Sequence, residues 1–155
     1  RPSQKGAKRS LLCEAAGVPV GLAHDGANRQ DQPLLAPTLA SIPIERPQPT
    51  AERPQHLCLD RGYEAASMHR LARAHGYEPH IRSRGEELAR KLRTPGWRAR
   101  RWVVEACHSW LNRNRGLLIR WCKKAENHLA FTQLACGLIA FKKAHAFSLA
   151  CGQMG

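Results

Sequence analysis

Two acidic side chains stand where a protein could use a carboxylate chemically. Asp60 follows the apolar run 57–59, which we expect to be a buried strand, and Arg61-Gly62 then turns the chain towards a helix. In open α/β sheets, functional groups gather beyond the carboxyl ends of the strands, so Asp60 is a candidate site residue. The same position suits an ordinary cap for the helix that begins near Tyr63. The local sequence favours neither interpretation over the other.

Glu105 is the second candidate and lies on a helix that we expect from about Trp97 to Arg115. Residues 98–124 hold eight Lys or Arg and this single acid. Helical spacing places one apolar stripe towards the sheet, formed by Val103, Val104, Cys107, Trp110 and Leu111. A polar stripe on another side of the helix is formed by Arg101, Glu105, His108 and Asn112. A surface pair between Arg101 and Glu105 would contribute only a few tenths of a kcal/mol. A role at a site therefore explains Glu105 better than the surface pair does.

The net charge of +13 favours a polyanionic partner. The charge is concentrated, because residues 82–124 contain thirteen Lys or Arg and three Glu, a local net charge of +10. An isolated basic run is usually a solvated face. Here the size of the excess favours DNA or RNA.

The elements that must position these residues follow an α/β order. We expect a hairpin from Ser10–Glu14 and Val18–His24 with Gly17 in its turn, after a loop over residues 1–9. Asp31 would cap a short helix with Pro33 in its first turn. Residues 43–54, with four prolines, form an exposed loop.

The second half supplies the remaining strands and helices. We expect a strand over 56–60, a helix over 63–75 stopped by Gly76, and a strand over 78–82. After the helix 97–115, Gly116 interrupts and an apolar run covers 117–121. A last helix spans about 127–143, capped by Asn127 and closed by Lys142 and Lys143. We expect residues 148–155 to be frayed. The order of strands and helices along the chain predicts a mixed sheet flanked by helices.

Composition excludes several classes of protein. No apolar stretch is long enough to span a membrane, and the N-terminus has no signal-peptide core. The six cysteines, at 13, 58, 107, 122, 136 and 151, form no C-x-x-C pair, which disfavours zinc. Four of them lie in apolar runs, so we expect buried reduced thiols in a cytoplasmic protein.

Three segments resemble insertion-sequence transposases of the DDE class. They are Gly26-Ala27-Asn28-Arg29-Gln30-Asp31, Leu59-Asp60-Arg61-Gly62-Tyr63 and the stretch Arg101 to Arg113 that contains Glu105. The resemblance runs from Lys5 to about Lys143. It implies a partial transposase catalytic domain over residues 1–147, with a proline-rich loop at 43–55 and a disordered tail at 148–155. The implied fold is a ribonuclease-H-like mixed sheet flanked by helices.

The resemblance also assigns the acids. Asp60 matches the family's second catalytic Asp and Glu105 its catalytic Glu, which together with a first Asp hold two Mg²⁺ or Mn²⁺ ions. In the family signature Tyr-x2-Arg-x3-Glu-x6-Lys, Arg101 and Glu105 fit. Arg98 stands where Tyr is expected and Asn112 where Lys is expected. Arg98 and Arg113 could supply the positive charge instead.

The family's first Asp has no counterpart here, because this chain begins after the central first strand that would carry it. In the implied strand order 3-2-1-4-5, Asp25 would stand three strands from Asp60, about 14 Å away at about 4.8 Å per strand. Two catalytic metals lie about 4 Å apart, so Asp25 cannot easily replace the first Asp. We therefore expect the isolated chain to be inactive or nearly so. The missing part would come from an N-terminal transposase half or from a second copy.

The implied reaction is metal-dependent DNA cleavage, followed by attack of the freed 3′-hydroxyl on target DNA. Asp60 would bridge the two metals and Glu105 would hold one of them. Candidate phosphate contacts are the basic residues Lys5, Lys8, Arg9, Arg98, Arg100, Arg101, Arg113, Arg115 and Arg120. Among the tryptophans, Trp97 is the best candidate for stacking on bases, whereas most of the others suit the core. The rival interpretations are a non-catalytic basic DNA-binding module and a partner-binding fragment that docks through the helix 127–143.

Overall fold

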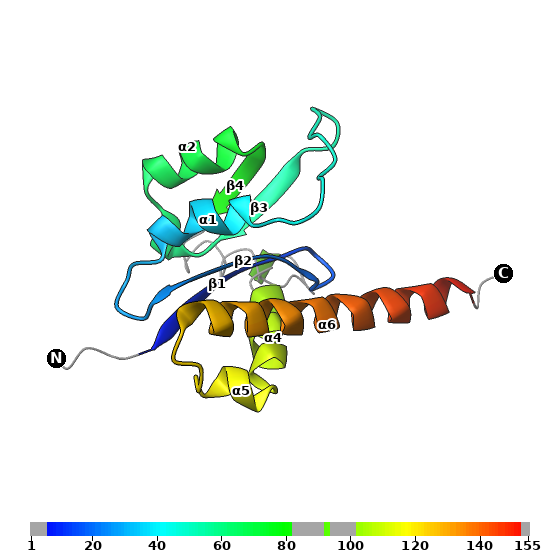
Figure 1. Ribbon diagram of the computed structural model, residues 1–155. Coiled ribbons are helices and arrows are strands. Elements are labelled where there is room, and N and C mark those ends of the chain that lie inside the picture. The colour runs from blue at the N-terminus through cyan, green and yellow to red at the C-terminus, as the bar shows by residue number, and fades with distance from the viewer. Residues whose placement is uncertain (1–5, 82–91, 94–101, 153–155) are drawn as a thin grey trace.

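The hairpin at the N-terminal end of the described chain forms the middle of the molecule (Figure 1). The computed structural model describes residues 6–81, 92–93 and 102–152. Strands β1 (Ala7–Cys13) and β2 (Pro19–Gly26) pair antiparallel, with Arg9 opposite His24 and Leu11 opposite Leu22. Gly17 takes a φ of 85° in the connecting turn, a conformation that glycine adopts at little cost. The hairpin is confirmed, and its first strand extends into residues 7–9, which we expected to be loop.

One layer packs on the face of the hairpin that carries Leu12. It begins with the 3-10 turn η1 (Gln32–Leu34) and helix α1 (Leu35–Ala40). Strand β3 (Gln55–Leu59), the 3-10 turn η2 (Arg61–Tyr63), helix α2 (Ala66–Ala74) and strand β4 (Tyr77–Ile81) follow. Leu35, Leu39, Leu57 and Ala72 form its buried core, with Leu12 packed against them. This β-α-β unit pairs β3 parallel to β4, as a crossover through helix α2 allows.

The proline-rich segment between α1 and β3 contains no helix or strand, as predicted. Arg46 anchors it to the body of the molecule. Its guanidinium donates to Gln55 Oε1 and to the His75 carbonyl, each at 2.7 Å, and lies 4.1 Å from the centre of the Tyr77 ring. One partly buried arginine therefore fixes the path of an otherwise irregular loop.

The other layer consists of helices α4 (Trp102–Asn112), α5 (Arg115–Leu118) and α6 (Ala125–Gly152) (Figure 1). Its core joins Leu11 and Leu22 of the hairpin to Cys107, Leu111 and Ala135, in addition to Leu117. Leu11 and Leu12 point to opposite faces of β1, as successive strand residues must, so the hairpin separates two cores.

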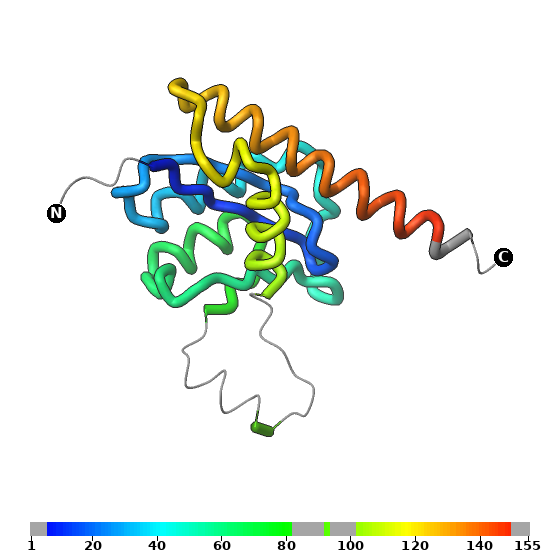
Figure 2. Tube along the Cα trace, turned by 90° about the horizontal axis from the view of Figure 1, so that it is seen from below, coloured from blue at the N-terminus to red at the C-terminus, as the bar shows by residue number. Residues whose placement is uncertain are grey.

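Helix α6 is longer than predicted at both ends. It starts at Ala125, so Asn127 is not its cap, and it continues through Gly152 rather than closing at Lys143. Lys143 is its last link to the hairpin: Nζ donates to the Ala16 carbonyl at 2.9 Å and lies 4.6 Å from the Trp110 ring centre. Beyond it, residues 144–149 are exposed and the helix projects from the body (Figure 2).

The mixed α/β class is confirmed, but the described strands do not form one sheet. They form two separate two-stranded sheets, β1–β2 and β3–β4. The helix boundaries at 112–115 also differ, because the break falls at Arg113–Asn114 and Gly116 lies within α5.

Candidate functional site

Asp60 lies where β3 gives way to the turn η2. Leu57 and Leu59 face the core under α1 and α2, so strand alternation places Cys58 and Asp60 on the other side. The Asp60 carboxylate accepts a hydrogen bond from the Arg61 amide at 2.7 Å and remains exposed. The side chain therefore caps the turn η2, and the role of Asp60 at a site stays a prediction.

Tyr63 fastens this turn to the hairpin. Burial raises the pKa of the Tyr63 hydroxyl, and its side chain hydrogen-bonds to Ser10 of β1. Ser10 is also bonded to Thr38 of α1 at 2.8 Å. The loop that carries Asp60 is thus held by side chains from two further elements.

Glu105 lies in the first turn of α4 and is exposed. Val103, Cys107 and Leu111 of the same helix are buried, which turns Glu105 away from the hairpin. Glu105 takes part in none of the ion pairs among the described residues. Arg101, its expected i,i−4 partner, lies outside them.

Asp60 and Glu105 come from elements with different packing partners. β3 packs chiefly on β4, whereas α4 packs on β1, α5 and α6. The described residues include no group of three or more His, Cys, Asp or Glu able to hold a metal ion. Exposed carboxylates are the donors that Mg²⁺ prefers, so the chemistry of the two residues fits the ion, but two ligands alone do not complete its site.

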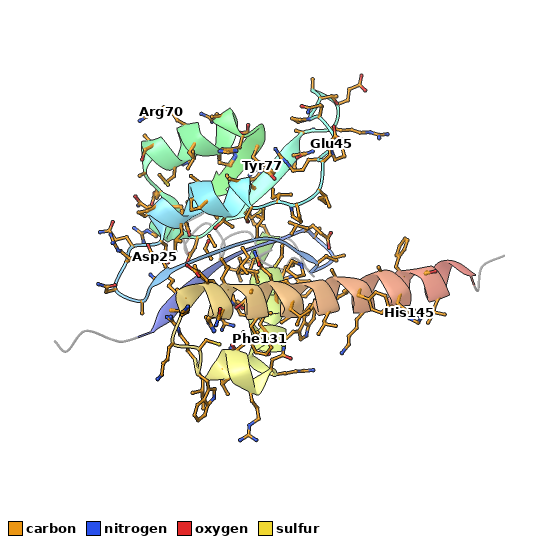
Figure 3. All side chains as sticks on the ribbon, in the orientation of Figure 1. Asp25, Glu45, Arg70, Tyr77, Phe131 and His145 are labelled. Atoms are coloured by element: carbon orange, nitrogen blue, oxygen red, sulfur yellow. The ribbon has the colours of Figure 1, made fainter. Side chains whose placement is uncertain are left out.

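The two other acids near the hairpin are engaged elsewhere. Asp25 lies 3.9 Å from the Arg29 guanidinium and accepts from the Gly26 amide; it stands at the end of β2 (Figure 3). Asp31 occupies the cap position before η1, but it forms no side-chain cap and pairs with Lys8 at 3.0 Å instead. Both carboxylates are therefore paired with basic side chains close to the hairpin.

The basic candidates divide into three groups. Arg113, Arg115 and Arg120 are exposed around α5. Lys8 is held by Asp31 and by the Arg29 carbonyl, and Arg9 points inward, donating to Asn112 Oδ1 at 2.6 Å. The rest lie outside the described residues: Lys5, Arg98, Arg100 and Arg101.

The tryptophans differ from expectation. Trp110 is partly buried against Gly17, as a core role requires, but Trp121 is 76% exposed and Trp102 51%. The sequence favoured a core position for most tryptophans other than Trp97, although Arg120 and the two lysines that follow Trp121 mark a polar, basic segment. An exposed aromatic ring among exposed arginines is a surface suited to single-stranded nucleic acid.

The Cys58 thiol also differs from expectation, because it is exposed rather than buried.

Comparison with known proteins identifies the family. The family model described as "Transposase DDE domain" matches residues 57–142, more than half of the chain. The chain belongs to the DDE-domain transposases. The matched range includes both Asp60 and Glu105, and the resemblance found in the sequence is thereby confirmed.

A protein of Burkholderia cepacia named as a candidate transposase for insertion sequence element IS402 is 35% identical over 141 residues. These cover 90% of this DDE-domain chain but 64% of the relative. No solved structure matches the chain significantly. Within the described residues, no helix is both long and apolar enough to cross a membrane.

Proposed function

We propose that this chain is the larger part of an insertion-sequence transposase that cleaves the DNA ends of its element and joins them to target DNA. The observation that carries the proposal is the family match across 57–142, which includes the two exposed carboxylates at the positions that the sequence motifs selected. Asp60 and Glu105 would hold divalent cations, Mg²⁺ or Mn²⁺. Such ions would supply an activated water and charge stabilisation on the leaving oxygen. The protein would act on DNA in the bacterial cytoplasm.

The split sheet supports an incomplete catalytic domain. A two-stranded sheet is marginal alone, and each of β1 and β3 has one strand neighbour among the described residues. One further strand between β1 and β3 would join the two sheets into a ribonuclease-H-like mixed sheet. That strand would also supply the first Asp, and an N-terminal transposase half or a second copy is its proposed source. Amide hydrogen exchange tests this. The β1 and β3 amides should exchange more slowly in the protein encoded by the longest reading frame that contains this chain than in the 155-residue chain alone.

The nuclease proposal is tested with that longest reading frame and labelled DNA carrying the element's ends. We expect Mg²⁺-dependent nicking that Asp60→Asn and Glu105→Gln each reduce by at least about 100-fold, since each removes a charged metal ligand. Asp31→Asn, which removes an equivalent charge, should leave nicking unchanged. The 155-residue chain alone should bind DNA without cleaving it. Robust nicking by the isolated chain would contradict the assignment of an incomplete site.

A second function, a non-catalytic DNA-binding module, is favoured by the exposed arginines and Trp121 around α5 and by the absence of a three-ligand metal group among the described residues. It predicts salt-sensitive DNA binding that survives Asp60→Ala together with Glu105→Ala. If the longest reading frame binds DNA in this way and never cleaves it, this second function replaces the first.

A further inference from the structure

One face of helix α6 carries large apolar side chains that the rest of the described fold leaves largely uncovered. Phe131, Leu134, Leu138 and Phe141 are 39%, 61%, 51% and 69% exposed. Phe131 is the least exposed of the four, because its ring lies against Gly116 of α5. The four residues are spaced by three, four and three positions, so they form one line along the helix, the α6 stripe. A contiguous line of exposed rings and leucines is typical of a surface that a partner covers.

The α6 stripe differs from an ordinary solvated helix face. Another face of the same helix is already buried, at Thr132 and Ala135, and Ala135 shares a core with Leu11 of the hairpin. Residues 127–141 contain no Lys, Arg, Asp or Glu, although the whole chain carries a net charge of +13. A helical segment without charged side chains on any face is ordinarily enclosed by protein. The stripe does not suit DNA, because phosphate contacts need basic side chains.

The α6 stripe is symmetric about its own midpoint. Phe131 and Phe141 lie five positions on either side of Cys136. Leu134 and Leu138 lie two positions on either side of the same residue. Two antiparallel copies of α6, related by a two-fold axis beside this midpoint, would place each Phe opposite a Phe and each Leu opposite a Leu. A two-fold contact requires one surface that is complementary to itself, and the order Phe-Leu-Leu-Phe meets that requirement. The symmetry therefore selects a second copy of this chain as the partner.

The border of the stripe leaves room for a second helix. Ala130, Gly137 and Ala144 lie along one side of it and are exposed, and a Cβ built on Gly137 would meet nothing within 4 Å. Small side chains at the contact allow two helix axes to approach closely. In the antiparallel pair, the projecting residues 144–149 of one copy would lie beside the N-terminal end of α6 in the other (Figure 2). The contact would thus support the part of α6 that projects from the body.

We propose that two copies of this chain form an antiparallel dimer through the α6 stripe. Four side chains are far fewer than the roughly 20–30 residues that each partner of a standard interface contributes, so the dissociation constant is on the order of 50 µM. Below about 1 µM the chain is then monomeric and Leu134 is exposed, so substitutions in the stripe act on association rather than on the stability of the monomer. The stripe contains neither Asp60 nor Glu105, and the dimer does not depend on the nuclease proposal.

The first test is sedimentation equilibrium of the purified 155-residue chain at concentrations from about 5 to about 500 µM, which bracket the expected dissociation constant. Leu138→Asp should weaken association by at least about 20-fold, because the dimer would bury a carboxylate without a partner. Ile44→Asp introduces the same charge at an apolar side chain that is 62% exposed on the proline-rich loop, and should leave association unchanged. A chain that stays monomeric throughout this range, or equal weakening in the two variants, would overturn the proposal.

The second measurement determines the direction of the pair and keeps the stripe apolar. The photoreactive analogue p-benzoylphenylalanine replaces Phe141, and the irradiated dimer is isolated by denaturing electrophoresis. The crosslinked residue is then located by fragmentation in a mass spectrometer. We expect it at or next to Phe131 of the other copy, which lies about 15 Å from Phe141 along a single helix, at about 1.5 Å per residue. Crosslinks from position 141 to position 141 would indicate parallel helices and would overturn the antiparallel dimer.

Discussion

At the residue scale, His24 makes folding sensitive to acid. Its pKa is about 4 in the folded chain, against 6.5 for an unperturbed histidine, because it is buried beside His128, Arg9 and Arg120. Protonation between these two values favours the unfolded chain. Stability present above pH 6.5 is therefore lost as the pH falls, and the loss is complete below about pH 4. His108 and His128 are shifted in the same direction, also chiefly by burial.

We predict that the free energy of unfolding, measured with urea, is lower at pH 5 than at pH 7 by roughly 1–2 kcal/mol. His24→Gln should flatten this dependence. The exposed His145 on the projecting part of α6 provides the control, and His145→Gln should keep the full dependence (Figure 3). A pH profile that is the same in both variants would remove His24 as its cause.

Gly21 is fixed by contact rather than by its backbone angles. A Cβ built on it would lie 2.7 Å from the Thr38 carbonyl oxygen and 3.3 Å from Leu12 Cβ, and a backbone oxygen cannot rotate away. We predict that Gly21→Ala destabilises the chain by about 1–3 kcal/mol. Gly62→Ala meets nothing within 4 Å and should be nearly neutral. Chemical denaturation of the two variants checks the difference.

At the element scale, α4 is held to the hairpin by a short apolar face. Leu111 is completely buried, whereas Leu134 of α6 is 61% exposed. The same substitution should therefore have unequal effects. We predict that Leu111→Ala costs about 2–5 kcal/mol of unfolding free energy and Leu134→Ala less than about 0.5 kcal/mol. A large effect of Leu134→Ala would show that a partner covers that face of α6. The loss of unfolding free energy should then depend on protein concentration.

The same elements show what the sequence could predict. Gly17, the alternation around Leu11 and Leu22, and the apolar run before Asp60 have local causes, and the hairpin and β3 were found from them. The predicted ends of α6 were wrong because Asn127 and the pair Lys142–Lys143 resemble the residues that begin and end helices. Tertiary contact through Lys143 and an apolar sequence beyond it continue the helix to Gly152. The candidate carboxylates came from motif spacing, whereas the contact between the His24 and His128 rings joins positions more than 100 residues apart and leaves no local pattern.

At the scale of the whole molecule, the charge of +13 should govern DNA affinity. Arg113 follows α4, Arg115 begins α5, and both side chains are exposed. We predict that the double variant Arg113→Gln with Arg115→Gln makes the negative slope of log affinity against log salt concentration shallower by about 1.8. Arg70→Gln with Arg73→Gln on α2 (Arg70 is labelled in Figure 3) removes the same charge from the opposite layer and should change the slope much less. Equal changes would show that net charge, and not this surface, determines binding.

The split into two sheets agrees with the strand order that the resemblance implies. Hydrophobic runs identify strands but not their neighbours, and pairing depends on which other strands are present. In the order 3-2-1-4-5, a chain without strand 1 leaves strands 3-2 and 4-5 as separate pairs, and the described strands form the two pairs β1–β2 and β3–β4. The expected metal ligands Asp60 and Glu105 were likewise named from the resemblance, and their roles stay predictions.

Helix α6 is a continuous rod of 28 residues, about 42 Å long at about 1.5 Å per residue. Residues 144–149 are exposed on the part of the helix that projects from the body, so a reporter attached at Phe147 or Leu149 would stand clear of both cores (Figure 2). A fluorophore there would tumble with the helix and report whether a second chain lies alongside it. Quenching of that fluorophore on mixing with unlabelled protein, or its absence, would measure assembly without disturbing a single packed side chain.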